Sequence, residues 1–383
     1  YVRDVSGADA RVLRGGIAVG LLPNESAPMP AEGVVANINL ASVDLDAWSA
    51  ALSSAAGTRL TTEPATRASS PGSSAALSYL PTSMAVRARE LTFGGRKLSN
   101  VVVGGTREGL TWRANMDAQE LNGYVEYRQP SGAGSGRVYA RLARLTLAQT
   151  SAADVESLLD EQPASIPALD IVVDDLELRG KRLGRVEIEA VNRGAGAVAR
   201  DGGVREWRLS KFNVVLPEAV FTATGNWANL NAQGAGSPAA ASERRRTVMN
   251  FKLDINDAGE LLSRLGMKDV IRRGKGKFEG QVAWVGSPLS PDYPSMGGSF
   301  KVGVEAGQFL KADPGIAKLL GVLSLQSLPR RLALDFRDVF SEGFSFDFVR
   351  GDVNIEQGIA STNNLQMKGV NAAVLMDGRA DIA

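Results

Sequence analysis

The sequence predicts a mainly β protein built from antiparallel strands, with only a few short helices. Apolar residues alternate with polar or small residues over many short segments, which is the period of a strand with one apolar face. Breakers separate several of these segments, at Ser341 and Gly343, at Arg350-Gly351 and at Gln357-Gly358, as tight turns require. Regular alternation of this kind is typical of an antiparallel sheet with one solvent-exposed face. A buried parallel sheet would show continuous apolar runs instead.

The alternating segments extend along most of the chain and predict strands. They include residues 34–40, 138–142, 251–255, 278–284, 300–304, 332–336, 344–348 and 353–355. Two further segments, 81–101 and 167–186, look like copies of one another. Each begins at a proline, alternates, turns at Gly-Gly-Arg-Lys or Gly-Lys-Arg, and alternates again, which predicts a repeated β-hairpin module.

Helical patterns are scarce. Ser42, Ser151, Asn256 and Asp313 can each cap a short helix, and Asp313 is followed by Pro314 at the first helical position. Four short helices cannot cover a sheet of this size. The apolar face must therefore be covered by a second sheet, by the same sheet curling over, or by a ligand.

Composition narrows the possible functions. The chain has no cysteine and no histidine, which excludes Ser-His and Cys-His nucleophile pairs, disulfides and zinc sites of the His/Cys type. Lys and Arg number 43 against 42 Asp and Glu, so the net charge of +1 does not favour a nucleic acid partner. We expect no cofactor, no metal and no enzymatic activity. The chain begins at Tyr1 without a signal segment, and we expect it to be a portion of a larger protein.

A few short motifs resemble functional sites but are interpreted as ordinary turns or solvated surface. Residues 274–277, Gly-Lys-Gly-Lys, lack the spacing of a phosphate loop and are interpreted as a solvated turn. Arg350-Gly351 is interpreted as a turn between strands. The basic residues at 244–246 and 272–277 could touch lipid headgroups, but the absence of interleaved aromatics favours a solvated surface. No spacing selects a catalytic pair among the acidic residues.

The segment at residues 323–369, LSLQSLPRRLALDFRDVFSEGFSFDFVRGDVNIEQGIASTNNLQMKG, carries a family resemblance. Its first part closely resembles the end of bacterial YhdP-type proteins, members of the AsmA-like group of repeating-β-groove lipid-transfer proteins. A weaker resemblance extends from about Val34 to the last residue, through residues 169–190 and 221–227.

The resemblance implies an elongated, strongly curved antiparallel sheet that forms an open trough, apolar inside and polar outside. It implies that phospholipid acyl chains occupy the trough and pass between the inner and outer membranes without chemistry. It also implies a periplasmic location, within a protein anchored in the inner membrane and reaching toward the outer membrane. Contacts with both membranes would then be made by parts of the protein outside this segment.

On this interpretation residues 1–383 form one continuous segment, with approximate sub-modules 1–80, 81–150, 151–250 and 251–383. The residues predicted to line the trough are Leu332, Leu334, Phe336, Phe344, Phe346, Phe348, Val353, Ile355, Phe300, Val302, Val304, Phe278, Val282, Trp284, Phe251 and Leu253. Alternation alone favours a filled β-sandwich or solenoid acting as an envelope scaffold or assembly factor, and the resemblance reverses this preference. A hydrolase of envelope glycans is a lesser alternative.

Overall fold

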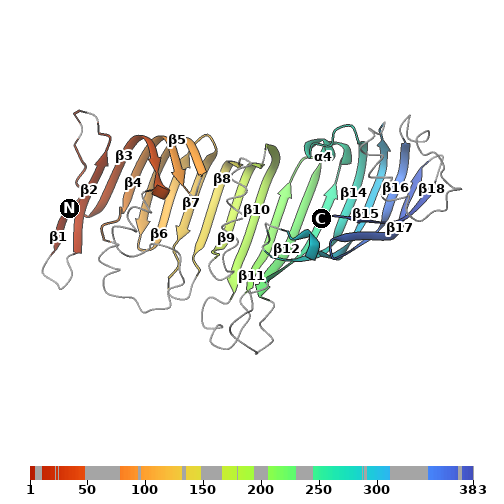
Figure 1. The fold of residues 1–383 in the computed structure, drawn as a ribbon. Coiled ribbons are helices and arrows are strands. Elements are labelled where there is room, and N and C mark those ends of the chain that lie inside the picture. Colours follow the sequence, from red (N-terminus) through yellow and green to blue (C-terminus); the bar gives the residue numbers. More distant parts are fainter. Residues whose placement is uncertain are drawn as a thin grey trace, which may run out of the picture. The chain divides into compact units, whose positions relative to one another are not determined.

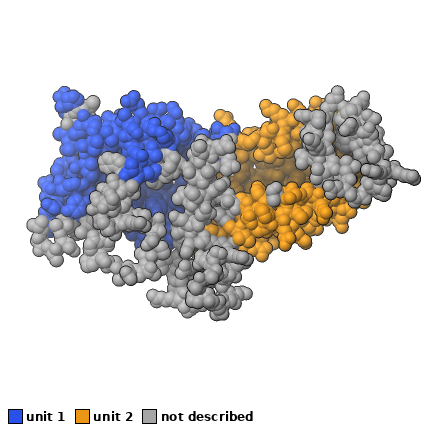
Figure 2. Space-filling view, viewed as in Figure 1, with its two compact units in different colours: residues 1–180, 195–198 blue, residues 181–194, 199–383 orange. Residues whose placement is uncertain are grey.

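Strands dominate the computed structural model of the chain (Figure 1), joined by the helix α4 (Ala258–Arg264) and the 3-10 turn η3 (Tyr293–Ser295). The structure describes residues 1–4, 11–21, 23–24, 26–47, 78–93, 96–131, 135–147, 166–178, 180–193, 206–229, 245–286, 288, 291–310, 344–369 and 373–382. The chain divides into two compact units, coloured separately in Figure 2. Unit 1 comprises residues 1–180 and 195–198, and unit 2 comprises residues 181–194 and 199–383.

In unit 1 each strand pairs with its neighbour along the chain. The strands are β1 (Val2–Asp4), β2 (Arg11–Val19), β3 (Gly33–Asp44), β4 (Ser83–Phe93), β5 (Arg96–Glu108), β6 (Thr111–Asp117), β7 (Leu121–Arg128), β8 (Arg137–Leu147) and β9 (Ala168–Leu178). Most pairs are antiparallel, as predicted, but β2–β3, β3–β4 and β8–β9 are parallel. Each parallel pair is joined by a connection long enough to carry the chain back to the same end of the sheet, whereas hairpins join the antiparallel pairs.

Unit 2 is an antiparallel meander. Its strands are β10 (Lys181–Arg193), β11 (Glu206–Val215), β12 (Ala219–Asn229), β13 (Arg245–Ile255), β14 (Ile271–Val285), β15 (Gly297–Phe309), β16 (Phe344–Glu356), β17 (Ile359–Gly369) and β18 (Ala373–Asp381). Every strand pairs antiparallel with the next. The predicted mainly β, antiparallel class is confirmed.

The predicted strands at residues 34–40, 138–142, 251–255, 278–284 and 300–304 are confirmed as parts of β3, β8, β13, β14 and β15. The first predicted hairpin copy is confirmed by β4 and β5, whose register runs from Ser83 opposite Thr106 to Phe93 opposite Arg96. Strands β9 and β10 occupy the second copy. The strand predicted at residues 332–336 and the helices predicted at Ser151 and Asp313 lie outside the described residues.

The turn predicted at Arg350-Gly351 is wrong, because β16 continues through these residues and Gly351 pairs with Val302. A Cβ placed on Gly351 would lie 2.7 Å from the Cα of Leu365. The glycine therefore marks a close approach of two strands and not a chain reversal. Residues 274–277, also predicted as a turn, lie inside β14. The turn at Gln357-Gly358 is confirmed, with positive φ at both residues.

Two helix caps differ from prediction by one or two residues. Ser42 lies within β3, and the Asp44 side chain instead accepts a hydrogen bond of 2.9 Å from the Ala47 N–H. Helix α4 follows Asp257, whose carboxylate accepts from the Glu260 N–H at 3.1 Å, so Asn256 is not the cap. Acceptors adjacent in sequence compete for the same position, and alternation cannot choose between them.

Candidate functional site

The strand register of unit 2 gathers apolar side chains into rows that cross the strands. Directly paired residues of an antiparallel sheet point to the same face, so the pairings define each row. We call two neighbouring rows the first and second rows. The first row is Ile188, Phe212, Ala223, Phe251, Gly280, Phe300 and Val353, and the second row is Val186, Val214, Phe221, Leu253, Phe278, Val302 and Gly351.

The large side chains of these rows are only partly buried. Phe212, Phe221, Phe251 and Phe300 all keep accessible surface although they come from interior strands. Their rings touch in sequence across the sheet, with centroids 5.8 Å apart for Phe212 and Phe221, 6.4 Å for Phe221 and Phe251, and 6.1 Å for Phe251 and Phe300. Aromatic side chains at the centre of a filled sandwich would be fully buried. The rows therefore form a connected apolar surface with one side left accessible.

A row of tryptophans bounds this surface toward one end of the strands. Trp207 pairs with Trp227, and Thr247 lies between Trp227 and Trp284 in the same row. Trp207, Trp227 and Trp284 are 7%, 1% and 2% exposed, so the side chains at this end of the strands are closely packed.

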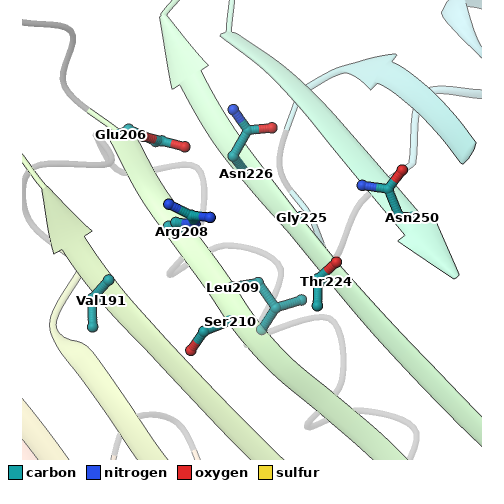
Figure 3. Close-up of a pocket in the computed structure, with 9 residues that line it drawn as sticks. All are labelled: Val191, Glu206, Arg208, Leu209, Ser210, Thr224, Gly225, Asn226 and Asn250. Atoms are coloured by element: carbon teal, nitrogen blue, oxygen red, sulfur yellow. The ribbon is translucent and has the colours of Figure 1, made fainter.

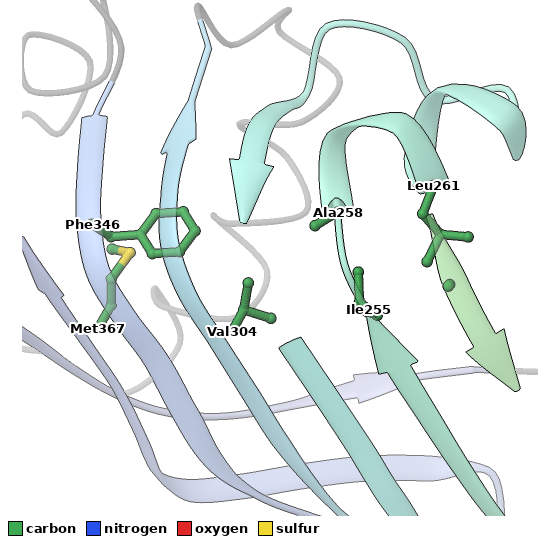
Figure 4. Packing of buried hydrophobic residues seen from close by; sticks show 7 residues of the cluster. Ile255, Ala258, Leu261, Val304, Phe346 and Met367 are labelled. Atoms are coloured by element: carbon green, nitrogen blue, oxygen red, sulfur yellow. The ribbon is translucent and has the colours of Figure 1, made fainter. Parts of the chain in front are cut away.

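Helix α4 bounds the opposite end. Ala258 and Leu261 of α4 pack with Ile255, Val304 and Phe346 in one buried cluster, which Figure 4 shows under the helix. On β12 the two boundaries lie eight residues apart, from Ala219 to Trp227, or about 26 Å at the rise of a strand. The partly exposed rows lie between them.

Glycines show toward which face the sheet of each unit bends. In unit 1, a Cβ on Gly105, which faces the apolar side, would lie 2.8 Å from the Arg113 carbonyl oxygen, whereas a Cβ on its neighbour Gly104 would meet nothing within 4 Å. In unit 2, a Cβ on Gly280 of the first row would lie 2.5 Å from the Phe300 Cα. A Cβ on Gly303, on the opposite face, would come no closer than 3.8 Å to any atom. Side-chain positions converge on the inside of a bend, so at these sites the apolar face is the concave one.

Unit 1 carries a comparable apolar face. Ile38, Val86, Val103, Met116 and Leu142 belong to one of its rows. Two buried clusters lie along the face, one around Val101 and Leu91 and one around Leu142 and Val173. Apolar rows on a concave face are therefore common to both units.

The opposite face of unit 2 is ionic. Lys252 and Asp254 form an ion pair on β13, and Lys277 and Glu279 form another on β14. The register places Lys252 opposite Glu279 and Asp254 opposite Lys277, so signs alternate in both directions. The hydrogen bond from Lys277 lowers the pKa of Glu279 below its ordinary value. These charges are exposed, which identifies the solvent side of the sheet.

Unit 1 shows the same ionic character. Arg113 contacts both Glu108 and Glu126 at 3.2 Å, and Arg141 contacts Asp170 at 2.7 Å. Charged groups on this face pair with opposite charges rather than converging as acids. Within the described residues, no group of acidic side chains is arranged to hold a metal ion.

An open pocket of about 760 Å³ lies on the ionic side of unit 2 (Figure 3). Arg208, Thr224, Asn226 and Asn250 contribute polar groups to it, and the Ser210 hydroxyl beside them donates to the Glu189 carbonyl at 3.0 Å. The pocket can hydrogen-bond water or a polar solute. Val191 and Leu209 add apolar contacts, so the lining is mixed, and the pocket lies on the face opposite the apolar rows.

The structure places most of the predicted trough residues together. Phe251, Leu253, Phe278, Val282, Trp284, Phe300, Val302, Val304, Phe346, Val353 and Ile355 share the apolar face. Leu332, Leu334 and Phe336 lie outside the described residues. Phe344 pairs with Phe309 through the backbone at the start of β16.

Phe348 does not share that face. It pairs with Glu305, and the Arg350 guanidinium lies 4.4 Å from its ring centroid on the ionic side. The register of β16 against β17 shifts between Phe346 and Phe348, and Ala306 on β15 has a positive φ of 53°. This irregularity reverses the alternation, so that Val349 takes the apolar position opposite Val304.

The sequence interpretation missed Phe212 and Phe221, which extend the rows onto β11 and β12. A register shift between Leu209 and Phe212 hid the period of β11. On β12, alternation from Ala219 to Trp227 was a usable signal.

Fold and faces together define a protein built on an open β-sheet surface, with apolar rows on one side and paired charges on the other. The family model described as "YhdP protein" matches residues 2–383, and the chain belongs to this family. The chain is also similar to "Intermembrane phospholipid transporter YhdP" of Escherichia coli (strain K12), with 28% identity over 163 residues. That match covers 42% of this chain and 12% of the relative, so the chain spans a small part of the relative's length. No solved structure matches the chain.

Proposed function

We propose that the apolar face of this chain carries phospholipid acyl chains between membranes without chemical change. The observation that carries the proposal is the half-buried state of the phenylalanine side chains in the first and second rows, which leaves an apolar surface for tails to contact. Membership of the YhdP family and the name of the E. coli relative support phospholipid as the cargo.

The physical basis is exchange of one apolar environment for another. Exposing a tail of about a dozen CH₂ groups to water costs on the order of 10 kcal/mol, at about 0.8 kcal/mol each. Contact with Phe251, Leu253 and Phe300 removes part of that cost while the rest of the tail stays on neighbouring lipid or protein. Contact with the partly exposed side chains of the rows leaves the rest of the tail free, which favours movement along them.

The proposal also covers the cellular location of the chain. A protein that passes lipid between two membranes has to lie in the envelope, and we place this chain in the periplasm as one portion of a longer bridge. Each unit then contributes an apolar lining of its own, which in unit 2 consists of the predicted trough residues on the apolar face together with Phe212 and Phe221. In the described part of the chain, no helix is both long and apolar enough to span a bilayer.

Photo-crosslinking on one strand tests the cargo. A photoreactive amino acid is placed singly at Phe251, Leu253, Asn250 and Lys252 of β13 in the full-length protein in cells. The side chains of Phe251 and Leu253 point to the apolar face, whereas those of Asn250 and Lys252 point to the ionic face. Neighbouring positions on this strand therefore differ only in the face that they report on. We expect phospholipid adducts at the first two positions and at least tenfold fewer at the other two.

The same experiment can reject the proposal. Equal adduct yields on both faces would remove the apolar rows as the lipid path. No adduct at any position, with the protein folded, would favour the filled-sandwich scaffold. Folding is checked by the far-ultraviolet circular dichroism of the purified variants, because Phe251 packs against the cluster that contains Trp284 and its replacement alters tryptophan fluorescence directly.

A further inference from the structure

The segment from Arg264 to Lys277 is strongly basic in a chain whose charges otherwise balance. It contains Arg264, Lys268, Arg272, Arg273, Lys275 and Lys277, with Asp269 as its single acidic residue. Two apolar side chains in the same segment are exposed, Leu265 at 43% and Met267 at 46%. Exposed apolar residues surrounded by cations differ from an ordinary solvated surface, which carries mixed charge.

The geometry joins these residues into one edge of unit 2, which we call the basic edge. Helix α4 ends at Arg264 and lies against the start of β14, since a Cβ on Gly259 would be 3.2 Å from the Arg273 nitrogen. Figure 1 shows α4 at the ends of the neighbouring strands. Lys181 of β10 adds a further cation, because its ammonium donates to the Leu265 carbonyl at 2.6 Å.

The positive charge at the basic edge is only partly neutralised. Arg264 forms an ion pair with Glu218, Lys277 forms one with Glu279, and Lys275 pairs through the backbone with Glu305. Lys268 and Arg272 are exposed and form no ion pair with any residue in the described ranges. Their charges therefore face water.

We propose that the basic edge docks on an anionic phospholipid bilayer. The lysine and arginine side chains contact lipid phosphates, and Leu265 and Met267 enter the interfacial region as the apolar anchors. Charge complementarity selects this partner, because a basic side chain near an anionic membrane surface gains binding energy and an adjacent aliphatic pair strengthens it. The basic edge lies outside the first and second rows, so the inference does not depend on whether tails occupy them.

Vesicle sedimentation with the full chain tests the inference. The vesicles contain phosphatidylcholine alone, or phosphatidylcholine with phosphatidylglycerol. We expect binding to the second kind only, falling steeply with added salt. Replacing Lys268, Arg272 and Lys275 together by glutamine should weaken binding about 100-fold, since each cation contributes about fivefold.

A matched control carries the same change of charge elsewhere. Arg87, Arg89 and Arg379 are exposed on other strands, and replacing all three by glutamine should change binding less than twofold. A third variant, Leu265→Ser with Met267→Ser, should weaken binding severalfold without changing its salt dependence. All the substituted side chains are exposed, so the variants keep the fold, which tryptophan fluorescence verifies.

Three results would overturn the inference. One is binding by the parent chain that does not require phosphatidylglycerol. Another is equal weakening by the two glutamine variants, which would reveal a response to net charge alone. The third is unchanged binding when the cations of the basic edge are removed.

Discussion

Replacing Gly280 by alanine tests the bend of unit 2 toward its apolar face. The added Cβ would lie 2.5 Å from the Phe300 Cα, with the Ser299 carbonyl equally crowded, and these are backbone atoms that no rotamer change can move. The neighbouring strand has to shift by about 1 Å, at a cost on the order of 1–3 kcal/mol in the free energy of unfolding. Neither Gly280 nor the control position has a positive φ, so the comparison isolates this steric term.

Gly303→Ala is that control, because its Cβ on the ionic face would make only an ordinary van der Waals contact, 3.8 Å from the Lys277 carbonyl oxygen. There alanine lowers the entropy of the unfolded chain and should stabilise by about 0.4–1 kcal/mol. Trp48 and Trp112 of unit 1 are replaced by phenylalanine in the parent and in both variants, so that urea unfolding followed by the fluorescence of the remaining three tryptophans reports on unit 2. The two variants should differ by about 1–3 kcal/mol, which is the steric cost at Gly280, because both gain the same entropy term. Equal stabilities would refute the inference that the apolar face is concave at Gly280.

Two further predictions concern stability at the end of the strands where α4 lies. Glu218→Gln should cost about 1–2 kcal/mol in the free energy of unfolding, because it leaves Arg264 without its nearly buried partner. The hydrogen bond from Arg264 lowers the pKa of Glu218, so the ion pair stabilises the fold at neutral pH. This contribution to the free energy of unfolding is lost as the pH falls through the lowered pKa. The free energy of unfolding of Glu218→Gln, measured against pH, should not show that loss. Phe346→Ala should lower the free energy of unfolding by about 3–5 kcal/mol, because Phe346 is 3% exposed. Phe348→Ala, on the ionic face, should lower it by less than about 1.5 kcal/mol. Similar losses of unfolding free energy for the two variants in urea would contradict the assigned faces.

Alternation in the sequence predicted the strands whose register is regular. Residues 251–255 and 300–304 appear in β13 and β15 with the expected face toward the rows. The prediction failed at the irregular position between Phe346 and Phe348, because one extra residue reverses every later side chain. Nothing in the local sequence marks that insertion. Its cause is the pairing with β15 and β17, which are distant along the chain.

The predicted turn at Gly351 failed for a related reason. Glycine in a strand can mark a turn or a close approach, and the sequence does not distinguish them. Here the neighbour is Leu365 of β17, and the contact depends on how the two strands cross. Which apolar rows stay accessible is likewise a tertiary property. A filled sandwich and an open sheet share the same alternation, and only the exposure of residues such as Phe251 separates them.

Stability and accessibility are divided between different parts of the same apolar face. Trp227 and Phe346 are almost completely buried at opposite ends of the strands, where each buried aromatic contributes several kcal/mol. Phe251 and Phe300 lie between them and remain partly exposed, so they contribute less to folding and keep surface free for a ligand. The hydrogen bonds between strands and the paired charges of the opposite face hold the sheet without needing that surface covered. A sheet supported in this way can leave its central rows open along the whole of unit 2, which is the property that transport of acyl chains requires.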